Sequence, residues 1–547
     1  MSTTTMAPAL SVTVRRDHLA GTATLIRFIL RRDRVRIPVW LVVLGLVSVG
    51  TLGSFLGTYP DPAARANIAQ TLHSPMGLAM TGPARYLENY HYGSILSHQM
   101  LGFTVLAVGM MSVLLVVRHT RAEEETGRAE LVRATVVGRH ANLAATLIVV
   151  AAVNVVLGLL IAATLAGSAA EGITGSGALL YGAAHTAAGL VFAAVAAVTA
   201  QITGYSRGAT GMGLAVVGLA YVVRAIGDAG ENALSWLSPI GWAQHTWPFL
   251  DDQWWPLLLS LALAAALTWL AVTLSSHRDV GTGLRQTRAG AARASNLLAT
   301  PFGFALRLHR GLLAGFGVAV AALAAMYGSL LGDVEAMLGD VDVITDALAE
   351  RGGALVEALV SMVMLVNAVV VTVYAVLAAT RVRSEETAGR AEPVLATPLH
   401  RSRWVLSHLA VVLLGSTLML VVAGLVLGGL GASTVDDGAF FGKAIGAALA
   451  YLPAVWCTIG VAVALFGLRP QWIGWTWLVP VWTFVAGYLG ELIGFPDWLA
   501  RLSPFGWVPE LPVADFALTP LVVLTALAAA LVALGLAALG RRSINTG

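Results

Sequence analysis

The single lysine of the chain is the first residue to consider for chemistry, because a phosphate-binding loop requires one. Proteins that hydrolyse ATP through such a loop carry the pattern G-x-x-x-x-G-K-[ST], whose lysine contacts the phosphates. Lys443 is the only lysine, and it stands in the segment 438–444, GAFFGKA. Its two glycines are one residue too close together, and no hydroxyl residue follows the lysine. We therefore expect no ATPase activity in this chain, so that ATP and Mg²⁺ would bind to a partner.

Residues that commonly bind metals or act as nucleophiles give no alternative chemistry. Cys457 is the only cysteine, which excludes an internal disulfide and a cysteine-based metal cluster. The 12 histidines show no H-E-x-x-H spacing. We expect neither a metal site nor a catalytic residue, and energy would come from a partner ATPase or from an ion gradient.

Charged residues recur in two matching segments. Residues 121–139 read RAEEETGRAELVRATVVGR and residues 383–401 read RSEETAGRAEPVLATPLHR, with eleven of nineteen positions identical at an offset of 262. Glu and Arg stand four residues apart in both copies, which predicts ion pairs on a short surface helix. Such a helix, exposing Glu and Arg, is suited to docking another protein. A solvated loop is the alternative interpretation.

A second pair of matching segments follows at an offset of 265, LSPIGW at 237–242 and LSPFGW at 502–507. Serine followed by proline is typical of a helix start. Nearby, Arg224 and Asp228 are spaced for a helical ion pair, and Gly490 with Glu491 repeats Gly227 with Asp228. These residues form either a structural pair or an outer gate, and the candidates are Arg224, Asp228, Pro239, Trp242, Glu491, Pro504 and Trp507.

The elements that would position these residues are membrane helices. The sequence is 57% hydrophobic and 12% charged, with a mean hydropathy of +0.78, whereas soluble proteins carry about 25% charged residues. About 20 apolar residues span the hydrocarbon core. Twelve stretches qualify, at 37–57, 97–117, 143–168, 179–205, 208–226, 256–274, 311–332, 355–380, 404–431, 443–468, 471–490 and 519–540. The predicted fold is an all-α polytopic membrane protein made of two parallel six-helix repeats.

Basic residues predict the orientation of these spans. With the N-terminus in the cytoplasm, most of the 33 basic residues lie on the cytoplasmic side, as the positive-inside rule requires. The exceptions are Arg65, Arg85, Arg224, Arg351, Lys443 and Arg501. Both termini are therefore expected in the cytoplasm.

We divide the chain into a cytoplasmic N-terminus with an elbow helix (1–36), a first half (37–274), a cytoplasmic linker with a second elbow helix (275–310), a second half (311–540) and a tail (541–547).

The twelve spans, the repeated EE-x-x-GRAE-x-V-x-AT-x-x-x-R pattern and the LSP-x-GW motif resemble an ABC type-2 exporter permease. The closest resemblance is to the actinobacterial group of polyketide-antibiotic exporters, and it covers essentially the whole chain. It implies a multi-pass protein of the plasma membrane with elbow helices near 18–34 and 296–310. It also implies that the loop after the second span of each half docks into a cytosolic ATPase. The implied coupling residues are Glu123, Glu124, Gly127, Arg128, Glu130, Arg139, Glu385, Glu386, Gly389, Arg390, Glu392 and Arg401.

The resemblance also implies a substrate pathway between spans two and five of each half. Thioether and aromatic side chains there suit bulky apolar guests. The candidates are Phe103, Met110, Met111, Met212, Tyr221, Met362, Met364, Asn367, Trp475, Trp482 and Phe484, and ordinary helix packing is the alternative for each of them. The expected partners are two copies of a cytosolic ABC ATPase, a hydrophobic drug or antibiotic, and membrane lipid, without nucleic acid. A proton-coupled twelve-span carrier and an ABC exporter of lipid are the alternative functions.

Overall fold

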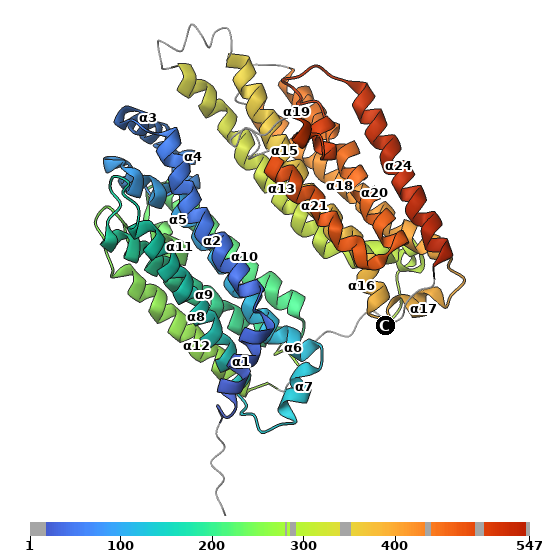
Figure 1. Ribbon diagram of the computed structural model, residues 1–547, viewed down its shortest axis with the longest axis horizontal. Coiled ribbons are helices and arrows are strands. Elements are labelled where there is room, and N and C mark those ends of the chain that lie inside the picture. The colour runs from blue at the N-terminus through green and yellow to red at the C-terminus, as the bar shows by residue number, and fades with distance from the viewer. Residues whose placement is uncertain are drawn as a thin grey trace, which may run out of the picture. The chain divides into compact units, whose positions relative to one another are not determined.

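The computed structural model describes residues 18–278, 282–284, 292–339, 352–432, 439–486 and 497–542. All regular elements in these ranges are helices, and they form two compact units, Met1–Ala289 and Gly290–Gly547. Figure 1 shows the long helices of each unit running side by side. Eleven helical segments of the described chain are long and apolar enough to cross a membrane. The prediction of an all-helical, polytopic membrane protein is confirmed.

The first unit contains six long apolar helices joined by shorter ones. Its elements are α1 (Thr22–Arg32), α2 (Arg36–Thr58), α3 (Pro62–Leu72), α4 (Pro75–Met80), η1 (Ala84–Asn89), α5 (Tyr92–His119), α6 (Arg121–Glu125), α7 (Arg128–Arg133), α8 (Ala141–Ala166), α9 (Gly175–Ile202), α10 (Ser206–Ala229), η2 (Ala233–Leu237), α11 (Pro239–Gln244) and α12 (Pro256–Ser276). The amphipathic helix α1 occupies the range of the first expected elbow, and it buries Leu25 and Ile29. It packs mainly against α8.

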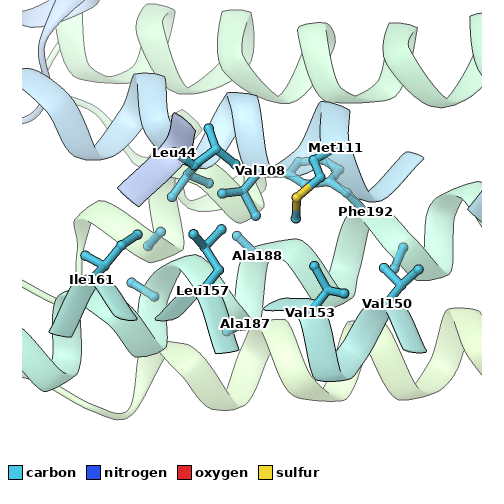
Figure 2. Close-up of a cluster of buried hydrophobic side chains, with 14 of the residues drawn as sticks. Leu44, Val108, Met111, Val150, Val153, Leu157, Ile161, Ala187, Ala188 and Phe192 are labelled. Atoms are coloured by element: carbon cyan, nitrogen blue, oxygen red, sulfur yellow. The ribbon is translucent and has the colours of Figure 1, made fainter. Parts of the chain in front are cut away.

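The core of this unit is formed by apolar side chains from all six of its long helices. Figure 2 shows Leu44 of α2, Met111 of α5, Leu157 of α8 and Phe192 of α9 in one buried cluster. Apolar contacts of this kind cannot drive association in lipid, where the surroundings are equally apolar, so close packing and polar contacts must supply the stability. Buried polar contacts are therefore expected to contribute to the stability of this unit.

The second unit repeats the pattern of the first with several differences. Its elements are η3 (Asn296–Ala299), α13 (Pro301–Gly339), α15 (Gly352–Ala379), α16 (Arg381–Thr387), α17 (Ala391–Leu395), α18 (Arg401–Gly431), α19 (Phe440–Ala450), α20 (Leu452–Leu468), η4 (Pro470–Trp477), α21 (Leu478–Phe484), α23 (Asp497–Ala500), η6 (Pro504–Trp507) and α24 (Leu518–Arg541). The expected second elbow, 296–310, is not a separate helix, because α13 runs without a break from Pro301.

The predicted eleventh span, 471–490, is another difference. Its first part is the 3₁₀-helix η4, and only the short helix α21 follows within the described residues. Residues 487–490 of this prediction lie outside the described ranges. The count of twelve spans therefore stays a prediction.

Candidate functional site

The two matching charged loops fold in the same way, as two short helices separated by a glycine. In the first loop α6 ends before Gly127, which has a φ of 72°, and α7 follows. In the second, α16 ends before Gly389, with a φ of 68°, and α17 follows. Glycine is the residue that adopts this left-handed conformation without strain, and it commonly ends helices.

This break corrects the predicted pairing within each loop. Glu124 with Arg128, and Glu386 with Arg390, were expected to pair across one turn of a continuous helix. The left-handed glycine stands between the two members of each pair, so they belong to different helices. Neither pair is formed, and both glutamates bind arginines elsewhere in the chain.

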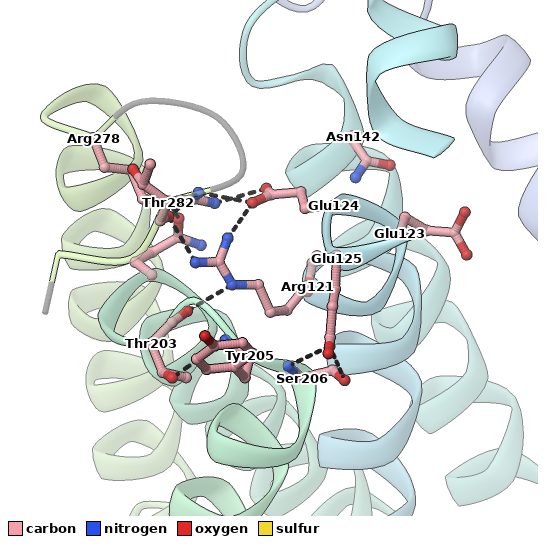
Figure 3. A network of polar contacts seen from close by, with 12 residues as sticks. Arg121, Glu123, Glu124, Glu125, Asn142, Thr203, Tyr205, Ser206, Arg278 and Thr282 are labelled. Carbon is pink, nitrogen blue, oxygen red and sulfur yellow. Dashed lines mark hydrogen bonds and ion pairs between the residues drawn. The ribbon is translucent and has the colours of Figure 1, made fainter. Parts of the chain in front are cut away.

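Glu124 forms a two-pronged ion pair with an arginine that follows the last long helix of the first unit. The Nη1 of Arg278 donates to Oε2 of Glu124 at 2.8 Å, and Nη2 donates to Oε1 at 2.7 Å. Both side chains are 8% exposed. Arg121 adds a further ion pair to Glu124 and donates to the carbonyls of Thr203 and Thr282, each at 2.6 Å. Figure 3 shows this network joining α6 to the segments beyond α9 and α12.

The second unit contains the same two-pronged pair. Arg542 follows α24, and its Nη1 and Nη2 donate to Oε1 and Oε2 of Glu386 at 2.8 and 2.7 Å. The Glu386 side chain is 4% exposed, and the Arg542 guanidinium lies 4.8 Å from the ring centroid of Phe466. We call the pairs Glu124–Arg278 and Glu386–Arg542 the two clamps, since each fastens a loop to the end of the last long helix of its unit.

The sequence interpretation missed Arg278 and Arg542. Both follow the last span of a half, and their numbers differ by 264, within the range of offsets of the two repeats. A search for basic residues at that offset would have found them. The clamps also show that Glu124 and Glu386 are buried, where exposed side chains had been expected.

The last arginine of each loop strengthens the same junction. Arg139 donates through Nη2 to the carbonyls of Ser275 and Ser276 at 3.2 and 2.8 Å. Arg401, its counterpart, donates to the carbonyl of Arg542 at 3.0 Å. Arginine near a helix C-terminus satisfies carbonyls that have no partner inside the helix.

The first glutamate of each loop is used differently in the two units. Glu123 pairs with Arg32 at the end of α1. Its counterpart Glu385 accepts from Nε of Arg390 at 2.8 Å, which raises the pKa of that guanidinium. The loops therefore share their clamp but differ in their contact with the elbow region.

Asp33 provides a second polar tie between the elbow and α5. Its carboxylate contacts Arg118 Nε at 3.2 Å and His119 Nε2 at 2.7 Å. Burial tends to raise the pKa of Asp33, but the hydrogen bond and charge of His119, with the charge of Arg118, outweigh it. The pKa of Asp33 is therefore lowered, and the carboxylate is ionised at neutral pH.

Several charged and apolar side chains of the two loops remain exposed. Arg128, Glu130, Arg390 and Glu392 are exposed, as are the two arginines at the loop ends. Two large apolar side chains accompany them in the first loop, Leu131 at 75% and Val136 at 93% exposure. Exposed apolar residues ringed by charges are typical of protein interaction sites. We call the exposed residues Arg128, Glu130, Leu131 and Val136 the first docking face.

The two LSP-x-GW motifs also make matching hydrogen bonds. Ser238 caps α11, and Ser503 caps η6, with Pro239 and Pro504 as the first residues of these helices. The indole Nε1 of Trp242 donates to the carbonyl of Trp236 at 2.6 Å, and that of Trp507 donates to Arg501 at 2.8 Å.

Each capping serine also binds a helix that precedes it in the chain. Ser238 Oγ donates to the carbonyl of Ala220 in α10 at 2.7 Å, and Ser503 Oγ lies 2.6 Å from Thr483 Oγ1 in α21. Each motif is therefore fastened to the element that its serine contacts, α10 in the first unit and α21 in the second.

Arg224 and Asp228 form the expected ion pair, with 3.3 Å between Nη1 and Oδ2 and both side chains buried. The Arg224 guanidinium also stacks on Tyr221, 4.4 Å from its ring centroid. Glu491 lies outside the described residues, so its proposed role beside them stays a prediction. These contacts are those of a structural pair, and they leave the gate untested.

The candidate pathway residues separate into two groups. Met111, Met364 and Asn367 are fully buried within their own units, which is the packing alternative that the sequence left open. Phe103, Met110, Met362, Trp475 and Phe484 are exposed on their units, and Met212, Tyr221 and Trp482 are partly buried. The rings of Phe103 and Tyr221 lie 5.6 Å apart, which brings α5 and α10 together.

Comparisons with known proteins agree with these features. A family model described as "Multidrug efflux system permease Rv1217c, C-terminal domain" matches residues 23–274 and 298–539. Each matched segment contains one charged loop and one LSP-x-GW motif. The multidrug efflux system permease protein Rv1217c of Mycobacterium tuberculosis (strain ATCC 25618 / H37Rv) is 39% identical over 537 residues. The alignment covers 97% of this chain and 96% of that protein.

Proposed function

Because the chain belongs to the family of the multidrug efflux system permease Rv1217c, we propose that it is the membrane subunit of an ATP-driven drug exporter. In this proposal the chain spans the plasma membrane twelve times, with both termini in the cytoplasm. Two copies of a cytosolic ABC ATPase bind ATP and Mg²⁺ and dock on the two charged loops. The cargo is a set of hydrophobic drugs or antibiotics.

The observation that carries this proposal is the pair of clamps. Each loop is fastened to the last long helix of its unit by a buried two-pronged ion pair, while its second helix exposes charged side chains, Arg128 and Glu130 in the first loop and Glu392 in the second. A loop that only returned the chain would need no such anchorage. A loop that transmits force from a docked protein needs both an exposed face and a rigid connection to the membrane helices.

Purification of the tagged chain from membranes of its own host is expected to recover a separate ATPase. Native mass spectrometry should give one 56.9 kDa permease with two ATPase copies, because the chain presents two loops. ATP hydrolysis should require the second protein. ATP hydrolysis by the purified chain alone would contradict the proposal, as would transport into proteoliposomes driven by a proton gradient without the ATPase.

The proposal that the cargo is a hydrophobic drug can be tested by substitutions on the exposed faces of α5 and η4. Phe103→Ala and Trp475→Ala should each change resistance to some hydrophobic compounds several-fold and leave others unchanged, because a flat ring binds apolar guests without demanding one shape. Resistance would be measured in cells that lack other pumps but produce the ATPase. Transport of a fluorescent phospholipid, with no change in drug resistance, would favour lipid as the cargo instead.

Met364→Ala is the matched control for these substitutions. Its side chain is fully buried, so its loss should lower the amount of protein and reduce resistance to all compounds alike. If the exposed rings behaved in the same way as Met364, they would be packing residues.

A further inference from the structure

A pocket of about 530 Å³ lies in the first unit among α2, α5 and α10. Its lining includes Arg36 and Trp40 of α2, Leu114 and Arg118 of α5, and Ser206 and Thr210 of α10. These residues stand at the start of α2, the end of α5 and the start of α10. All three helix ends belong to one membrane surface, because consecutive spans alternate in direction and α2, α5 and α10 are the first, second and fifth.

We propose that this pocket binds the headgroup of an anionic phospholipid. Two arginines and two hydroxyl residues line it, and guanidinium and hydroxyl donors are the chemistry that recognises a phosphate. Basic pockets between membrane helices are known to bind anionic lipid headgroups. Trp40 is placed as interfacial tryptophans are, with an apolar ring and a polar N–H at the headgroup level.

The charged residues around the pocket leave the Arg36 side chain available to bind an anion. Arg118 is partly neutralised by Asp33, which also contacts His119. Glu125 lies beside the pocket, where it accepts from the backbone N–H of Ser206 at 2.8 Å and from its hydroxyl. Arg36 is exposed, and no hydrogen bond or ion pair joins its side chain to another residue within the described ranges. An anionic group would supply that missing partner.

The walls of the pocket indicate a lipid as the source of the anion. Val39 and Leu114 line it, and Val43 and Met110 continue the same faces of α2 and α5 one turn further along. All four side chains are exposed on the unit, between 37% and 54%. An acyl chain can follow this apolar surface, whereas a soluble anion would gain nothing from it.

Native mass spectrometry of the delipidated permease in detergent tests the inference. Dioleoyl phosphatidylglycerol is expected to bind at one site with clearly higher affinity than dioleoyl phosphatidylcholine. The substitution Arg36→Gln should weaken phosphatidylglycerol binding about fivefold, the effect of removing one basic residue near an anionic headgroup. Thr210→Val should also weaken it.

Arg34→Gln is the matched control, because Arg34 is exposed, stands two residues away and does not line the pocket. It should leave the affinity unchanged. Equal losses for Arg34→Gln and Arg36→Gln would overturn the proposal in favour of general surface charge. Equal binding of the two lipids, or displacement of phosphatidylglycerol by millimolar inorganic phosphate, would overturn it too. The assay needs neither ATPase nor transport, so its failure would leave the proposed function standing.

Discussion

The substitution Glu386→Arg is expected to unfold much of the second unit at temperatures that the wild-type permease survives. Glu386 is 4% exposed and neutralises Arg542 through two hydrogen bonds. Removing one partner of a buried ion pair costs about 3–5 kcal/mol because the other charge stays buried and unpaired. Reversal is worse, since it places two guanidinium groups together. The measurement is the fraction of detergent-purified protein that stays monodisperse after heating.

The double substitution Glu386→Arg with Arg542→Glu should restore most of the lost heat resistance, because the exchanged charges can pair again. Glu392→Arg is the control, since Glu392 belongs to the same loop but is exposed. It should leave the melting curve within experimental error. A Glu386→Arg protein that melts like Glu392→Arg would mean that the clamp contributes nothing to stability.

The substitution Leu131→Glu is expected to reduce stimulation of the partner ATPase by at least about tenfold without lowering the heat resistance of the permease. Leu131 is 75% exposed on the first docking face, so the folded chain loses no contact. In the proposed complex it would be covered by the ATPase, where hot-spot residues each contribute about 2 kcal/mol or more, and about 1.4 kcal/mol corresponds to tenfold. The measurement is ATP hydrolysis in the reconstituted complex.

Leu284→Glu serves as the control, because Leu284 is also exposed, at 41%, and belongs to a different segment of the same unit. It should leave ATPase stimulation unchanged. Stimulation that persists in the Leu131→Glu protein would exclude the first docking face as the ATPase site, and the loop would then be a solvated connection.

The long helices were predictable because hydropathy and length determine them. The stretch 37–57 is found as Arg36–Thr58, and 519–540 as Leu518–Arg541. The prediction for α13 began ten residues too late, since Arg307 and Arg310 lower the local hydropathy without interrupting the helix. Hydropathy indicates which part of a helix can lie in the hydrocarbon core, whereas the helix itself ends only where its backbone hydrogen bonding is interrupted.

The site was predictable in position but not in its contacts. The repeat located both loops, and the matching glycines in it could have indicated the helix break. The i,i+4 rule failed because it assumes a continuous helix. No local rule pairs Glu124 with an arginine 154 residues away. The available signal in the sequence was that the glutamate and the arginine of the clamp both recur at nearly the same offset. Only the structure shows that they contact each other.

The clamps have a consequence for the biosynthesis of the protein. Glu124 precedes Arg278 by 154 residues and Glu386 precedes Arg542 by 156. At about 5–20 residues per second, each loop emerges from the ribosome roughly 8 to 30 s before its arginine does. Arg278 is nevertheless translated before Glu386. Glu124 can therefore pair with Arg278 before Glu386 has been synthesised. The order of translation thus favours the correct ion pairs over an exchange of partners between two similar loops.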